Sequence, residues 1–514
     1  MSLVRSIATV GGFTMLSRIT GLMREMMIAQ YMGASAVADA FFVAFRFPNL
    51  FRSLFAEGAF NAAFVPLFTG KLTAEGEAEA RSFAEQALVV MAIVLAAFVA
   101  VVEIGMPWAI YALAPGFGEV PGKLQVAVEL SRICFPYLLF ISLTSLQAGV
   151  LNSLGKFAAA AGTPVLLNVV AMTGLWALAP YTATPGHALA WGTFAAGIAQ
   201  FTWLVFSVRK AGMPLRLVRP RLTPEVKMLG KRIVPGALGA GVYQVNLVVN
   251  TMIASTVANG AVSYLNYADR VNQLPLGVIG IAIGTALLPL LSRQLKAGEL
   301  DAARESQNRA MEFALLMTLP AAAALMTIAE PVIRVLFQRG SFGPVETTAT
   351  AAALMAFAVG LPAYVLVKVL VPAFFARMDT RTPVKVAGAT VALNVALNLA
   401  LVGPLAHVGM ALSTALAAWF NVVVLAVILK RRGFFAMDAR LKAKVPRILG
   451  ATLVTAAALA AARHWAWPLA TNGWLAMGIL AAIVVAGLLA FMIAAHVLGA
   501  ARLGEIKKML RRKA

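Results

Sequence analysis

The sequence predicts an all-α, polytopic membrane protein with fourteen transmembrane helices. Three observations support this fold class: long apolar spans, no alternation of apolar and polar residues within them, and basic residues concentrated in every second loop. The 514 residues are 61% hydrophobic and only 12% charged, which excludes an ordinary soluble globular domain. Transmembrane β-strands would alternate over about ten residues, so helices are expected instead.

Each predicted helix corresponds to an apolar span long enough to cross a bilayer, which takes about 20 residues. The spans are dominated by Ala, Leu, Val and Gly. In chain order they lie at residues 6–31, 36–66, 83–112, 124–150, 157–180, 187–208, 233–256, 262–291, 311–336, 346–375, 384–403, 407–429, 446–466 and 473–499.

The basic loops predict the orientation of these helices. The net charge is +22, and most of the 43 Lys and Arg residues fall in loops that share one side of the membrane. Because cytoplasmic loops are rich in Lys and Arg, both termini are expected in the cytoplasm. The loops then contact anionic membrane lipids, and no nucleic acid partner is expected. Only four basic residues fall in loops on the opposite side: Lys123, Arg334, Arg339 and Arg463.

The first six spans and the next six form a predicted internal repeat. Pro66 and Asn168 recur, at a nearly constant offset, as Pro289 and Asn394. Six helices return the chain to its starting side, so the two lobes form a parallel repeat. The last two spans lie outside this duplication, either as a groove for an acyl chain or as a packing support or oligomer contact. The expected parts are an N-lobe at 1–220, a C-lobe at 221–432, and two appended helices with a basic tail at 433–514.

Charged residues inside the first two spans and the eighth span mark the candidate site. An Arg or Asp at mid-bilayer costs about 2.5–3.5 kcal/mol, so these side chains are expected to face a polar interior. Arginine matches phosphate oxygens with a planar fork of donors, which points to an anionic cargo. Alternatively the charges form internal ion pairs, and for Arg46 a pair with Asp39 is the favoured interpretation. The charged residues are Arg18, Arg24, Glu25, Asp39, Arg46, Arg52, Glu57, Asp269 and Arg270.

Three stretches resemble the MurJ (MviN-type) lipid II flippase family. They read TMLSRITGLMREMMIA, ADAFFVAFRFPNLFRSLFAEGAFNAAFVP and SYLNYADRVNQLPLGVIGIAIGTALLP. The resemblance implies the fold of the multidrug/oligosaccharidyl-lipid/polysaccharide exporter superfamily. It also implies movement of the undecaprenyl-pyrophosphate-linked peptidoglycan precursor, lipid II, across the inner membrane for cell wall synthesis, with the peptidoglycan synthesis machinery as a possible partner. By this resemblance Arg18, Arg24, Arg52 and Arg270 bind the substrate, with Asp39 and Glu57 as supporting charges in the same motif. The charge pattern itself adds Arg46 and Asp269 as further supporting charges.

Some members of that family are thought to hold sodium with aspartates and an asparagine. The corresponding candidates here are Asn250, Asn394, Asn398 and Thr414, none of them a carboxylate. Asn394 and Asn398 lie one helical turn apart, so hydrogen bonding between helices is the favoured interpretation. The four histidines do not cluster, so no other metal site is expected.

The sequence predicts a transporter with no catalytic residues and no cofactor. It contains no P-loop, no CxxC motif and no plausible Ser-His-Asp set, so membrane potential or an ion gradient is the expected energy source. Within transport, the alternatives are a cation-coupled drug exporter or an exporter of another polyprenyl-linked glycan. A membrane glycan polymerase or ligase would need a large outer loop, and every outer loop here is short.

Overall fold

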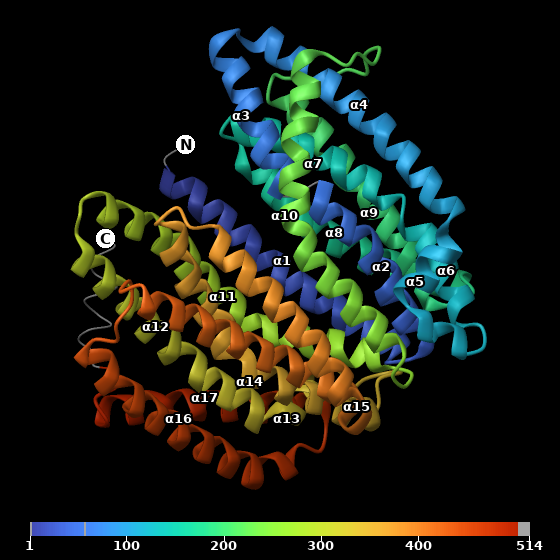
Figure 1. Ribbon diagram of the computed structural model, residues 1–514. Coiled ribbons are helices and arrows are strands. Elements are labelled where there is room, and N and C mark those ends of the chain that lie inside the picture. The colour runs from blue at the N-terminus through green and yellow to red at the C-terminus, as the bar shows by residue number, and fades with distance from the viewer. Residues whose placement is uncertain (1–2, 56–57, 502–514) are drawn as a thin grey trace. The chain divides into compact units, whose positions relative to one another are not determined.

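The computed structural model describes residues 3–55 and 58–501, and every regular element in these ranges is a helix (Figure 1). The predicted all-α membrane fold is therefore confirmed. Within the described residues, nine helices are long and apolar enough to cross a membrane. The total of fourteen crossings stays a prediction.

Contacts between Cα atoms divide the chain into two compact units, Met1–Ser263 and Tyr264–Ala514. The predicted lobes were bounded by sequence repetition at residues 220 and 432, which is a different criterion from compactness. The division into an N-lobe, a C-lobe and an appended pair therefore stays a prediction.

The first unit runs from blue to green in Figure 1. Its α-helices are α1 (Leu3–Met32), α2 (Ala36–Phe55), α3 (Gly58–Ala74), α4 (Glu77–Ile104), α5 (Met106–Leu113), α6 (Lys123–Cys134), α7 (Tyr137–Ser153), α8 (Phe157–Leu178), α9 (Pro185–Lys210) and α10 (Pro224–Ser255), with short 3-10 helices η1 (Pro115–Glu119) and η2 (Ala179–Tyr181).

Small residues and stacked phenylalanines hold the first unit together. Gly174 of α8 lies so close to Gly192 of α9 that an added Cβ would come within 2.5 Å of the Gly192 Cα. Such contacts between small residues let helix backbones approach closely inside a membrane. The Phe64 ring stacks on Phe68 and on Phe83 of α4, so α3 and α4 share one apolar core.

The second unit runs from yellow-green to red in Figure 1. Its helices are α11 (Ala261–Lys296, which begins at the end of the first unit), α12 (Leu300–Thr327), α13 (Ala329–Phe337), α14 (Pro344–Phe375), α15 (Arg381–Arg431), α16 (Ala439–Ala466) and α17 (Gly473–Val497), with the 3-10 helix η3 (Trp467–Leu469).

The α15 segment comprises two helices joined at a break. Ala406 has φ 48° and ψ −132°, two residues after Pro404, which cannot donate a helical hydrogen bond. The break falls between the predicted spans 384–403 and 407–429. One long apolar stretch thus supplies two separate helices to the second unit.

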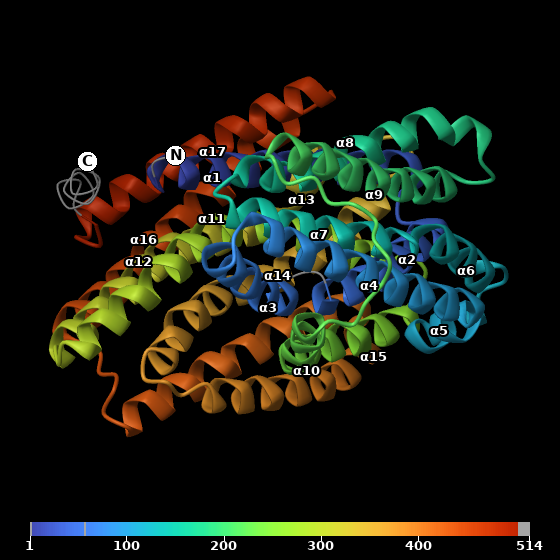
Figure 2. The same ribbon diagram turned by 90° about the horizontal axis from the view of Figure 1, so that it is seen from above.

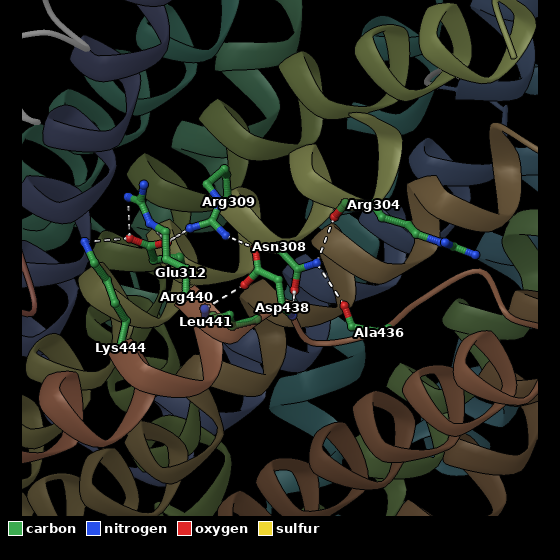
Figure 3. Close-up of polar contacts among 9 residues, drawn as sticks. All are labelled: Arg304, Asn308, Arg309, Glu312, Ala436, Asp438, Arg440, Leu441 and Lys444. Atoms are coloured by element: carbon green, nitrogen blue, oxygen red, sulfur yellow. Dashed lines mark hydrogen bonds and ion pairs between the residues drawn. The ribbon is translucent and has the colours of Figure 1, made fainter. Parts of the chain in front are cut away.

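A polar network joins α12 to the start of α16 (Figure 3). Arg309, Arg440 and Lys444 all pair with the Glu312 carboxylate, and Arg440 does so through two hydrogen bonds of 3.1 Å. Arg309 also pairs with Asp438, whose second oxygen accepts from the Leu441 amide and caps α16. The network therefore fixes the first turn of α16 against α12.

The helices α16 and α17 lie side by side at the edge of the second unit (Figures 1 and 2). Gly487 of α17 faces Leu459 of α16, and an added Cβ would lie 2.5 Å from the Leu459 Cδ2. Gly478, also on α17, has no atom within 4 Å of such a Cβ. One face of α17 is therefore used for packing against α16, and another is exposed.

Candidate functional site

Two predicted site residues of α2, Asp39 and Arg46, point toward α10 and the turn that follows it. The Arg46 guanidinium donates to the Thr251 hydroxyl of α10 at 2.8 Å. The Asp39 carboxylate accepts from the backbone N–H of Gly260, in the turn that follows α10. Residues seven apart return to nearly the same helical face, so this shared orientation agrees with the sequence spacing.

Asp39 is fully buried and bound by four donors. One oxygen accepts from the Lys123 ammonium and from the Gly260 amide, both at 2.8 Å. The other accepts from the Ser263 amide at 2.9 Å and from its hydroxyl at 2.6 Å. Lys123 is 5% exposed and also donates to the Asn259 side chain at 2.8 Å. A buried carboxylate is therefore paired and fully hydrogen-bonded, as its burial requires.

The predicted pair between Asp39 and Arg46 is not formed, because the Asp39 carboxylate pairs with Lys123 instead. Sequence reasoning had assigned Lys123 to an outer loop, where a basic residue is normally solvated. It lies instead at the first position of α6 with its Nζ 4.3 Å from the centre of the Phe117 ring. One feature of the sequence could have indicated this role: Lys123 is one of few basic residues on the predicted outer side of the membrane.

Arg24 lies buried on α1 beside an acidic partner. Its guanidinium pairs with Glu25 at 2.9 Å, and their side chains are 9% and 2% exposed. The guanidinium carbon also lies 5.3 Å from the centre of the Phe45 ring on α2. The Nε atom is buried and has no hydrogen-bond partner within the described part of the chain. The predicted internal ion pair is thus present, yet it leaves a buried donor of Arg24 unused.

Arg18 and Arg52, the other candidate substrate-binding arginines on these two helices, are half-buried. Arg18 lies on α1, six residues before Arg24. Arg52 donates through Nε to the Asn49 side chain at 2.9 Å, a neutral acceptor one turn earlier on α2. Glu57, the other acidic residue of this motif, lies outside the described residues.

Asp269 and Arg270 are half-buried on α11, within the second unit. Gln273 donates its side-chain amide to Asp269 one helical turn away. On the same helix, Gly280 leaves room for Lys368 of α14, whose Nζ would lie 2.7 Å from an added Cβ. The α11 helix therefore brings a second set of charged groups into the second unit.

Three of the four candidate ion ligands lie in α15, and two of them join a hydrogen-bonded network. Asn394 and Asn398, 2% and 0% exposed, lie before the α15 break, and both bond to Ser413, which follows it. Asn398 also donates to Asn394 at 3.4 Å, while Thr414 donates to the Met410 carbonyl of its own helix. Ser413 was missed by sequence reasoning, since a single serine in an apolar helix carries little signal. Asn250 lies on α10 in the first unit.

In the described ranges no three His, Cys, Asp or Glu side chains come together in a way that could hold a metal ion. Cys134, the single cysteine, is buried in α6. Among the candidate site residues that the structure describes, cations outnumber carboxylates: Arg18, Arg24, Arg46, Arg52 and Arg270 against Glu25, Asp39 and Asp269. Such a set suits an anionic ligand that carries several oxygens.

Comparison with known proteins agrees with these features. The family model described as "Lipid II flippase MurJ" matches residues 28–486. A protein of Rhizobium meliloti (strain 1021), named "Probable lipid II flippase MurJ", is 44% identical over 521 residues, which cover 100% of this chain and 97% of the relative.

Solved structures give the same result. A structure titled "Lipid II flippase MurJ, inward closed conformation" aligns with a TM-score of 0.78 at 26% identity, over 95% of this chain and 98% of that chain. An inward-facing multidrug resistance MATE family transporter of the MOP superfamily aligns with a TM-score of 0.69 at 16% identity, over 83% of this chain and 95% of that chain, which shows a shared fold. The chain is thus a multi-pass inner-membrane transporter rather than an enzyme, and it belongs to the MurJ family of lipid II flippases.

Proposed function

We propose that this protein moves lipid II from the inner to the outer leaflet of the cytoplasmic membrane. Lipid II carries a pyrophosphate, and the cargo site must therefore offer cations within the membrane. The observation that supports this most directly is Arg24, which is 7% exposed and holds a buried Nε donor without a protein acceptor in the described residues. A buried donor of this kind is costly unless a ligand satisfies it.

Arg18, Arg24 and Arg52 supply the cationic groups of the first unit in this proposal, and Arg270 supplies one in the second. The acid Asp39 is already held by Lys123, so it does not neutralise these arginines. Arg46 and Arg52 donate to the neutral side chains of Thr251 and Asn49. Asp39, Arg46 and Asp269 then act as supporting charges, and Glu57 keeps its predicted supporting role.

Transport requires access to alternate between the two sides of the membrane, and the Asp39 contacts suit a closed state on one of them. Four hydrogen bonds join the start of α2 to Lys123 and to residues 260–263. In this proposal, opening on that side separates α2 from these residues and breaks the four hydrogen bonds, and the free energy for it comes from cargo or from the membrane potential. We assign this side to the cell exterior and both termini to the cytoplasm, following the basic loops.

The asparagines of α15 support a structural role better than a sodium site. Sodium prefers oxygen ligands, and the Asn394 and Asn398 oxygens already accept hydrogen bonds from Asn398 and Ser413. We therefore propose that these residues hold the two halves of α15 together. The appended helices α16 and α17 offer an exposed apolar face, and we propose that the polyprenyl tail lies along it.

The decisive experiment is lipid II flipping in liposomes. The purified protein is reconstituted with labelled lipid II, and the accessible fraction in each leaflet is measured over time. Arg24→Ala should abolish flipping. Arg24→Lys should retain part of it, because lysine keeps the positive charge but lacks the planar fork of N–H donors of arginine. Arg132→Ala is the matched control, since Arg132 also lies on an apolar helix but is exposed. Normal flipping by Arg24→Ala would remove the physical support for this cargo.

A further inference from the structure

A cavity of about 410 Å³ lies at the end of α16 in the second unit, and none of the arginines of the proposed cargo site lines it. The last residue of α12, the final turns of α16 and the 3-10 helix η3 form its walls. The lining residues are Thr327, Ala460, Arg463, His464, Trp467 and Pro468. Cavities of this volume accept small ligands or the headgroup of a larger one.

One cation, Arg463, lines this cavity, and a second, Arg334, lies against Trp467 of its wall. Arg463 donates to the Thr327 carbonyl at 2.9 Å and pairs with Glu330 at 2.6 Å, which uses two of its five N–H donors. The guanidinium of Arg334 lies 5.4 Å from the centre of the Trp467 ring, with one N–H directed at the Ala470 carbonyl. Two cations against one carboxylate leave the surroundings of the cavity positive.

The presence of Arg334 and Arg463 here is unusual for this chain. They are two of the four basic residues that the loop pattern assigns to the outer side, where positive charge is otherwise scarce. Topology signals therefore do not account for them. Arg463 has more N–H donors than its contacts with Glu330 and the Thr327 carbonyl use, and a ligand that carries negative charge can accept from the others.

Exposed aromatic residues place the cavity at the depth of lipid headgroups. Trp465 and Trp474 are 77% and 85% exposed and lie in or next to the same turn between α16 and α17. Tryptophan is enriched at the boundary between hydrocarbon and water, where its ring is apolar and its N–H remains hydrated. Leu469, 63% exposed, adds apolar surface beside them.

We propose that this cavity binds the phosphodiester headgroup of an anionic membrane phospholipid. The N–H donors of Arg463 that neither Glu330 nor the Thr327 carbonyl uses match phosphate oxygens, and His464 offers a further polar group. Trp467 and Pro468 supply an apolar wall for the glycerol carbons, while the acyl chains remain in the bilayer. The lipid would bind where α12, α16 and η3 meet and would stabilise their contact.

The test compares lipids that differ only in headgroup charge. The purified full-length protein is titrated in detergent with phosphatidylglycerol or phosphatidylcholine, and bound lipid is counted by native mass spectrometry. Phosphatidylglycerol should bind more tightly, and Arg463→Gln should weaken it roughly tenfold, the effect of losing one charged hydrogen bond. Ala460→Trp should also abolish the preference, because it fills the cavity without changing any charge. The matched control is Arg219→Gln, an exposed arginine in the loop before α10.

Equal binding of the two lipids, or an unchanged preference in both Arg463→Gln and Ala460→Trp, would overturn the proposal. Inorganic phosphate is the third ligand. If it displaces phosphatidylglycerol at comparable concentration, the site is a free-anion site and the lipid assignment is wrong. If Arg463→Gln fails to fold, Ala460→Trp decides the question alone, since it leaves the pair of Arg463 and Glu330 intact.

Discussion

The ammonium group of Lys123 lies 2.8 Å from the carboxylate of Asp39, and the two side chains are 3% and 1% exposed. The pair connects the start of α6 with the start of α2, and its other hydrogen bonds reach the turn between α10 and α11. Three chain segments thus meet at one buried ion pair. Removing either charge leaves the other buried without a counterion, which is far more costly than removing both.

Lys123→Met should therefore lower the free energy of unfolding by about 3–5 kcal/mol, the usual effect of breaking a buried pair. Thermal unfolding in detergent measures this loss. The double variant Lys123→Met/Asp39→Asn should recover part of it, because the carboxylate is no longer charged. A Lys123→Met protein as stable as the wild type would contradict the assigned role of this pair.

The Glu312 network should control how firmly α16 is attached to α12. Glu312→Gln removes the charge that Arg309, Arg440 and Lys444 share, so we expect a loss of about 1–3 kcal/mol. Hydrogen exchange at the amides of residues 439–444 should become faster. Asp301→Asn is the control, because Asp301 pairs with Arg304 while its side chain is 97% exposed. Exposed pairs contribute little, and equal effects of the two variants would refute the distinction.

Substitutions at two glycines of α17 can distinguish packing against α16 from contact with the lipid tail. Gly487→Leu should lower stability by about 1–3 kcal/mol, because it forces a side chain against Leu459 in the α16 interface. Gly478→Trp should leave stability unchanged, because nothing lies near that position. If the polyprenyl tail lies along this face, Gly478→Trp should nevertheless slow lipid II flipping. Normal flipping by this variant would leave α17 as a packing element only.

Labelling of introduced cysteines can determine the orientation of the chain in the membrane. Cys134 is buried, so the wild type should give little background with an impermeant thiol reagent. Exposed residues in predicted outer loops, Ser35, Ala183 and Ala258, should react as cysteines in spheroplasts. Cysteines at the exposed positions Ala78 and Leu217 should react only after the membrane is opened. The reverse pattern would place both termini outside.

The sequence by itself determined the fold class, the positions of most helices and the family. Apolar length and helical composition are local properties, so spans such as 157–180 and 473–499 closely match α8 and α17. The same holds for the shared direction of Asp39 and Arg46, which follows from their spacing on one helix. The charged motifs on α1, α2 and α11 were likewise visible without a structure.

Only the tertiary structure decided which groups these residues meet. Asp39 pairs with a lysine 84 positions away, and Asn398 meets Ser413 after a break in α15. Glu312 forms ion pairs with Arg440 and Lys444, which lie on a helix more than a hundred residues further along the chain. Helical periodicity fixes the face on which a side chain lies, whereas the packing of distant helices fixes what lies opposite it.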